Sequence, residues 1–214
     1  MSRFFATFFT IMIFILWYAY ERNKVTRIAQ KNSELFWETE RIANSTRKKS
    51  LDGLEKITIP INELPFYTTE DEELLRYQNY IKELSSMDII NLTGISNTDL
   101  KLTYGAPNFS YLSDCDQNFT DLARTLNQWA KRLLELEQED DARKVLEFAV
   151  SCKSDVSTTF EMLSSIYVKK KQGEKILELI QVAENLNTLL KPNIISSLEK
   201  AYVNAGSGFD SIFD

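Results

Sequence analysis

Two stretches of the sequence, thirty-four positions apart, decide the fold. Residues 124–150 read RTLNQWAKRLLELEQEDDARKVLEFAV, and residues 158–184 read TTFEMLSSIYVKKKQGEKILELIQVAE. Aligning them pairs large side chains with large and small with small: Leu126 with Phe160, Trp129 with Leu163, Ala130 with Ser164, Leu133 with Tyr167, Leu146 with Ile180, and Ala149 with Ala183. Self-similarity at a fixed period of this size indicates a repeat architecture. The alignment therefore predicts two consecutive helical hairpins in an all-α fold.

Small residues explain how the two helices of the first hairpin can approach each other. They are Ala130, Ala142 and Ala149, and the larger Trp129, Leu133 and Leu146 are expected to fill the space between the helices. The acidic turn at residues 137–141 suits the positive end of a following helix. Gly173 marks the equivalent turn of the second hairpin.

This pattern resembles the tetratricopeptide repeat. The first unit carries the spacing of that family: Leu126, Trp129, Ala130 and Leu133 on one helix, then Ala142, Leu146 and Ala149 on the next. The resemblance covers about residues 119–190 and implies an α-solenoid. It departs from the family in three ways: the first turn lacks the usual glycine, Ser154 stands where a proline often ends the repeat, and Ile176 replaces an alanine. Ile176 is expected to open or repack the second hairpin.

The resemblance also implies a binding surface, because such repeats commonly hold peptides on the concave face of their first helices. The corresponding positions here are Arg124, Asn127, Gln128, Lys131, Thr158, Glu161, Met162, Ser165 and Lys169. The alternative is an ordinary solvated helix face.

A capping helix is expected to close the repeat region, which we place at residues 119–205. Pro192 opens that helix, and Ile195, Leu198 and Tyr202 are predicted to face inward. Residues 206–214 follow as a flexible tail or a short docking motif.

The N-terminus carries an apolar run from Phe4 to Tyr20, FFATFFTIMIFILWYAY. As a helix it is about 25 Å long, at the short end of what crosses a bilayer. We therefore predict a transmembrane anchor over residues 1–20, with a buried core helix and a cleaved signal peptide as alternatives. Basic residues after the run favour a cell-membrane protein whose remainder lies in the cytoplasm. The whole layout resembles uncharacterised membrane-anchored repeat proteins of Gram-positive bacteria, a resemblance that implies no activity.

Residues 21–50 are predicted to form a basic helical stalk. Six of its positions alternate in steps of three and four, as in a short coiled coil, and two of them are polar: Val25, Ile28, Asn32, Leu35, Thr39 and Ile42. A homodimer through the stalk is one interpretation, and an amphipathic helix lying on the membrane or on the domain is the other.

Residues 51–118 are expected to hold an extended arm, a helix and packed loops. Pro60 and Pro65 make residues 57–66 extended. Thr68 or Thr69 is predicted to cap the helix, which buries Leu74, Leu75, Tyr77, Ile81 and Leu84.

The apolar segment 88–116 follows that helix and is expected to form loops and short turns pressed onto the helices. Tyr104, Phe109 and Tyr111 are predicted to act as plugs, and a functional loop is the alternative.

Composition narrows the possible functions. The 214 residues include no histidine and no phosphate-binding glycine motif, so we expect no enzyme, no cofactor and no metal. The net charge is −6, and residues 1–50 carry nine Lys/Arg against four Asp/Glu. A basic foot suits a membrane surface, while the acidic remainder argues against nucleic-acid binding.

We therefore expect a membrane-tethered docking module for a protein or peptide partner. The alternative is a structural or assembly subunit whose repeats only pack against a neighbour. Cys115 and Cys152 fall at the same pole of the first hairpin, where they would stay thiols in a reducing compartment or pair outside it.

Overall fold

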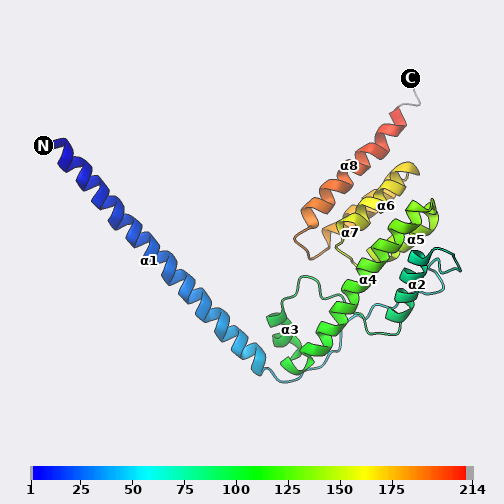
Figure 1. Ribbon diagram of the computed structural model, residues 1–214, viewed down its shortest axis with the longest axis horizontal. Helices are drawn as coiled ribbons and strands as arrows, with labels where there is room; N and C mark the ends of the chain where they lie inside the picture. Colours follow the sequence, from blue (N-terminus) through cyan, green and yellow to red (C-terminus); the bar gives the residue numbers. More distant parts are fainter. Residues whose placement is uncertain (1, 211–214) are drawn as a thin grey trace. The chain divides into compact units, whose positions relative to one another are not determined.

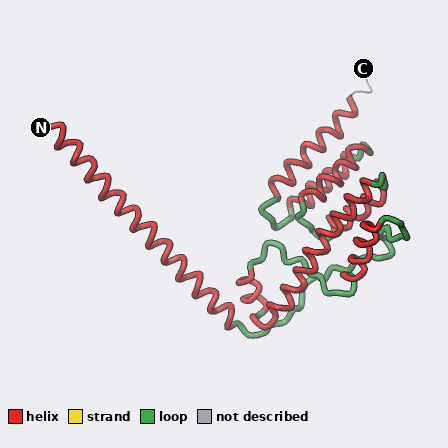
Figure 2. Tube along the Cα trace, viewed as in Figure 1, coloured by secondary structure: helices red, strands yellow, loops and turns green. Residues whose placement is uncertain are grey.

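The computed structural model describes residues 2–210, with side chains for residues 8, 9 and 11–206. This part of the chain contains helices and loops but no strand (Figure 2), so the predicted all-α class is confirmed. The elements are α1 Ser2–Ser45, α2 Glu72–Leu84, α3 Asn97–Tyr104, the 3₁₀ helix η1 Ala106–Asn108, α4 Phe109–Glu135, α5 Glu139–Ser151, α6 Ser157–Lys169, α7 Gly173–Glu184 and α8 Lys191–Asp210. They fall into two compact units: Met1–Ser50 with Ser96–Phe109, and Leu51–Ile95 with Ser110–Asp214.

The first unit is built on α1, a single uninterrupted helix drawn from blue to cyan in Figure 1. Helix α3 packs near its C-terminal end, where Ala43 is completely buried. Lys101 Nζ lies 3.4 Å from Glu40 Oε2, and the Thr98 hydroxyl donates a hydrogen bond to the same carboxylate. The segment holding α3 and η1, which we had grouped with residues 51–118, therefore belongs with α1.

A tight turn secures the chain that leaves α1. Gly105 has φ +91°, and any side chain there would overlap the carbonyl of Arg47. Asn108 Nδ2 donates to the carbonyl oxygens of Lys49 and Tyr104, both at 2.8 Å. A glycine and an asparagine are required here because the two backbone segments approach so closely.

Within the predicted anchor, Phe4 to Tyr20, the side chains of residues 4–7 and 10 are not described. Over the residues that the structure describes, none of the helices is both long and apolar enough to cross a membrane. The transmembrane prediction is therefore not supported by the structure.

The second unit contains the repeats, and its turns repeat with the period found in the sequence. Glu137 and Lys171, thirty-four positions apart, have left-handed backbones with φ 59° and 54°. After each, the next amide donates across the turn to a carbonyl five residues back, Gln138 N to Leu133 O and Gln172 N to Tyr167 O, both at 2.8 Å. Both hairpins thus use the same helix-ending hydrogen bond. The predicted turn residue, Gly173, is instead the first residue of α7.

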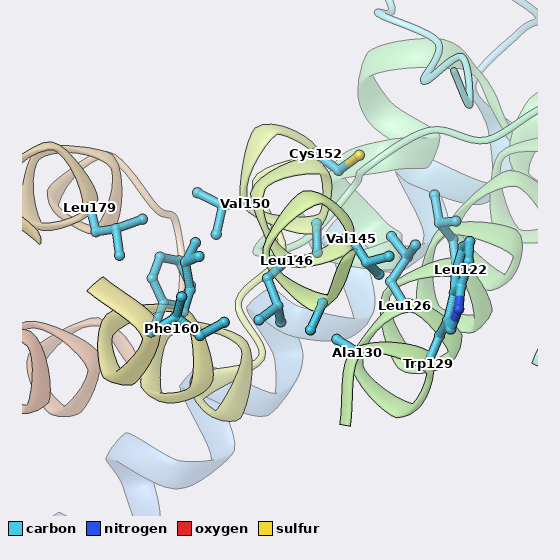
Figure 3. Packing of buried hydrophobic residues seen from close by; sticks show 14 of the residues in the cluster. Leu122, Leu126, Trp129, Ala130, Val145, Leu146, Val150, Cys152, Phe160 and Leu179 are labelled. Atoms are coloured by element: carbon cyan, nitrogen blue, oxygen red, sulfur yellow. The ribbon is translucent and has the colours of Figure 1, made fainter. Parts of the chain in front are cut away.

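The core of the second unit lies where the alignment placed it. Trp129, Ala130, Leu133, Ala142, Leu146 and Ala149 are all completely buried. Figure 3 shows Leu126 and Ala130 of α4 facing Val145 and Leu146 of α5, with Phe160 of α6 on the far side of α5. Ile176 is also completely buried.

The extended arm and α2 complete this core. Ile57 N donates to Ile89 O at 2.9 Å, and the ring of Phe66 lies 5.0 Å from the ring of Trp129. Asp71, not Thr68 or Thr69, caps α2, because its carboxylate accepts from Leu74 N at 2.8 Å. The predicted stripe is buried except for Leu75, which is half-buried.

Two boundaries differ from the sequence prediction. Helix α4 begins at Phe109, ten residues earlier than the repeats suggested. Helix α8 contacts both α6 and α7 and continues to Asp210, so the predicted tail is helical where it is described, and residues 211–214 lie outside the described part. Ile194 and Leu198 of α8 are buried, whereas Tyr202, predicted to face inward, is exposed.

Candidate functional site

The predicted binding face begins at the contact between α4 and α6, the first helices of the two hairpins. Asn127 Nδ2 donates to the hydroxyls of Thr158 and Thr159, at 2.9 and 3.0 Å. Thr159 is completely buried, so the Asn127 amide joins the two hairpins. Because both of its N–H groups are used, only its carbonyl oxygen remains to meet a ligand.

The charged residues of this face are exposed and weakly held. Arg124 lies 3.4 Å from Asp121 on its own helix, and Lys169 lies 3.0 Å from Glu139 on α5. Exposed pairs of this kind contribute little, about 0–1 kcal/mol, so an incoming carboxylate can replace the partner. Gln128 and Lys131 are exposed and make no side-chain hydrogen bond or ion pair with any described residue.

Three of the predicted residues line one concavity. It lies between α6 and α8 and has a volume of about 380 Å³. Its α6 wall includes Glu161, Ser165 and Lys169, and its apolar floor includes Val168 and Ala201. Met162 is half-buried and packs against the core, so it is not part of the open surface. Arg124, Gln128 and Lys131 of α4 do not line this groove.

The other wall was not predicted. Helix α8 contributes Ser197, Lys200 and Asn204, residues that we had assigned to a cap. A further shift of thirty-four positions would have found them, because it pairs Phe160 with Ile194 and Ser164 with Leu198, which are all buried. Helix α8 therefore occupies the position that the first helix of a third hairpin would take. The prediction placed Ile195 instead of Ile194 in the core and so misjudged which face is open.

A second concavity, of about 360 Å³, lies at the C-terminal ends of α5 and α7. Asn91 Nδ2 donates to the carbonyls of Cys152 and Lys153, both at 3.1 Å, and so closes the end of α5. Ile90 N donates to Cys115 O at 3.3 Å, so consecutive residues contact the two cysteine positions. Both cysteines are free and buried, and burial raises the pKa of Cys152 to about 11.

Two further side chains of this unit, Tyr167 and Asp140, have shifted pKa values. Burial and a hydrogen bond to Glu147 raise the pKa of Tyr167, and a hydrogen bond from Lys170 lowers that of Asp140, so both keep their usual charge near neutrality. Among residues 2–210, no three His, Cys, Asp or Glu side chains gather in a way that could hold a metal ion. The concavity between α6 and α8 presents two lysines, one glutamate and serine hydroxyls, which are groups that can bind a polar ligand.

Comparison of the chain with known protein families, with curated proteins and with solved structures finds no match.

Proposed function

We propose that this chain is a membrane-tethered docking protein without catalytic activity. Helix α1 supplies the tether, and the face formed by α4, α6 and α8 binds an acidic polypeptide segment.

The exposure of α1 supports the tether. The described large apolar side chains from Phe8 to Tyr20 are 43–68% exposed, and nearly all of them follow one another along the sequence. Consecutive helical residues point about 100° apart, so these side chains cover every side of the helix. A helix that is apolar all round belongs in an apolar surrounding, either a protein core or a lipid bilayer.

The length of the apolar run is compatible with a bilayer. At 1.5 Å per residue, Phe4 to Tyr20 is about 25 Å long, whereas the hydrocarbon layer is about 30 Å thick. Local thinning accommodates a mismatch of this size at modest cost. Trp17, Tyr18 and Tyr20 stand at one end, where aromatic side chains favour the membrane interface.

One observation carries the docking proposal: the α6–α8 groove offers Lys169 and Lys200 above an apolar floor. Lys200 makes no ion pair among the described residues, and Lys131 on α4 extends the basic character of the face. The only acid on the groove wall is Glu161. An extended segment with carboxylates around a small apolar side chain fits this surface by charge and shape.

A peptide-binding assay tests the docking proposal on the full chain in lipid nanodiscs. Acidic peptides should bind better than basic peptides of equal length. The double change Arg124→Glu with Lys131→Glu, and separately Lys200→Glu, should each weaken binding about tenfold or more while leaving helicity unchanged. Lys144→Glu on α5, outside the face, is the matched control.

Two results would contradict the docking proposal. If no peptide binds, the alternative of an assembly subunit takes its place. If the double variant, Lys200→Glu and the control Lys144→Glu all act alike, the interface is not on this face. The tether is tested separately by alkaline carbonate extraction of native membranes, which should leave the chain in the membrane fraction.

A further inference from the structure

The second half of α1 carries an apolar row that nothing in the first unit covers. Val25, Ile28, Leu35 and Ile42 are each about half exposed, although they are aliphatic. With Asn32 and Thr39 they repeat in alternating steps of three and four, a period of 3.5 residues. Alternating steps of three and four are the spacing by which two helices wind around each other.

Helix α3 leaves this row open. It packs on the side of α1 that holds Ala43, which is 0% exposed, while the adjacent Ile42 is 49% exposed. Lys101 of α3 also donates to Asn44 Oδ1 at 2.9 Å, on the same side of α1 as Glu40. The first unit thus packs on α1 directly beside the C-terminal end of the row, and it leaves the side chains of the row exposed.

The polar members of the row point to an identical partner. The Thr39 hydroxyl donates to Leu35 O at 2.8 Å, so it is satisfied within the helix. The Asn32 carboxamide has no hydrogen-bond partner among the described residues. In a parallel dimer the same asparagine from each chain meets across the two-fold axis, and each supplies both a donor and an acceptor.

The flanking positions allow the two helices to be parallel. On one side of the row stand Ala29 and Phe36, followed by Ala43, which the first unit covers, and on the other stand Lys24, Lys31 and Glu38. A parallel pair brings each side of one helix against the opposite side of its partner. Lys24 and Lys31 then face the uncharged Ala29 and Phe36, so no like charges meet there.

We infer that residues 25–42 of α1 form a parallel two-stranded coiled coil with a second copy of this chain. The row covers fewer than the three to four heptads of a self-sufficient coiled coil. Its stability therefore rests on the proposed tether, because two chains held in one membrane have a high effective concentration.

Disulfide crosslinking of full-length chains in native membranes tests this inference. Leu35→Cys lies on the row, and Ser33→Cys, also exposed, lies off it. Under mild oxidation Leu35→Cys should form covalent dimers about tenfold more efficiently than Ser33→Cys. Ile28→Cys is a second row position that should behave like Leu35→Cys. The unsubstituted chain is the background, because Cys115 and Cys152 are buried.

The outcomes separate the coiled coil from the tether. Equal crosslinking at both positions, or none at either, in chains that resist carbonate extraction overturns the coiled coil and leaves the tether intact. If carbonate removes the chains, the tether has failed. Sedimentation of the purified chain at high concentration then decides the coiled coil. A dimer that Leu35→Lys abolishes supports it, and a monomer overturns it.

Asn32→Val should add oligomers larger than dimers, because the buried asparagine selects the two-stranded state.

Discussion

Helices α1 and α4 are both long and rich in large apolar residues, but these residues are arranged and buried differently in the two helices. In α4 the apolar residues form a stripe, and Trp129 within it is completely buried against its own unit. In α1 they lie on every side, and Trp17 and Trp37 remain 57% and 66% exposed. The surface that α4 needs is provided by the same chain. The surface that α1 needs must come from outside the residues that the structure describes.

Replacing tryptophans gives the strongest test of this contrast. Trp129→Ala should lower the free energy of unfolding by about 3–5 kcal/mol, because it empties a large buried volume. Trp37→Ala should change it by less than about 0.5 kcal/mol, as exposed substitutions usually do. Urea unfolding followed by circular dichroism measures both. A harmless Trp129→Ala would show that the repeat alignment is wrong.

Trp129→Phe sharpens the same test. The Trp129 indole N–H is buried without a hydrogen-bond partner among the described residues. Phenylalanine removes this unpaired donor and keeps most of the ring, so it should cost clearly less than alanine. Equal losses for the two variants would mean that the indole N–H does find a partner.

The next largest effect should be confined to the first unit. Gly105→Ala should destabilise that unit by about 2–4 kcal/mol, because it combines a positive φ with overlap against the backbone of Arg47. Gly53→Ala is the control: Gly53 has φ +90° but open space around it, and should cost about 1 kcal/mol. Faster hydrogen exchange in α3, with α5 and α6 unchanged, is the expected result. Faster exchange throughout the chain would mean that the two units unfold together.

A smaller change should stabilise the second unit. Glu137 and Lys171 hold left-handed backbones that glycine adopts without strain. Glu137→Gly and Lys171→Gly should each raise the free energy of unfolding by about 0.5–1 kcal/mol. Because the two turns share one geometry, the gains should be equal. A loss at either position would show that its charged side chain stabilises the turn more than its backbone strains it.

Acid should weaken each unit through a different carboxylate. Hydrogen bonds from Arg132 lower the pKa of Asp71 in the second unit, and one from Thr98 lowers that of Glu40 in the first. A carboxylate with a lowered folded pKa stabilises the fold above its ordinary pKa of about 4. This stabilisation is lost as the pH falls below that value and through the lower folded pKa.

Neutral variants separate the two carboxylates. Asp71→Asn should flatten the acid dependence of α2 protection alone, and Glu40→Gln that of α3 alone, in hydrogen exchange measured across this pH range. An unchanged pH dependence in either variant would remove that carboxylate as the cause.

The sequence was informative where one residue pattern has one structural solution. A small residue such as Ala142 between two large-residue rows requires closely packed helices, and it is completely buried. The same period predicted Glu161, Ser165 and Lys169, which line the α6–α8 groove. It failed at α8 because Ile195 and Tyr202 were placed inward beside Leu198, whereas Ile194 is the buried residue, and neighbouring positions on a helix point about 100° apart.

The features that the sequence did not reveal depend on contacts between distant residues. Nothing local shows that Lys101 meets Glu40, since sixty-one positions separate them. The turn glycine was misassigned for a related reason. Gly173 looks like a turn residue, but the left-handed position two residues earlier is occupied by Lys171, which tolerates the strain.

The unbroken course of α1 has a mechanical consequence. Beyond Tyr20 the helix continues to Ser45 with no proline or glycine to bend it, so this stretch is a stiff rod about 37 Å long. Under the proposed tether, with this rod along the bilayer normal, the chain leaves α1 several Debye lengths from the headgroups at physiological salt, since one such length is about 8 Å. The rod would then be a spacer that holds its own C-terminal end, where Lys101 meets Glu40, away from the field of the anionic lipid.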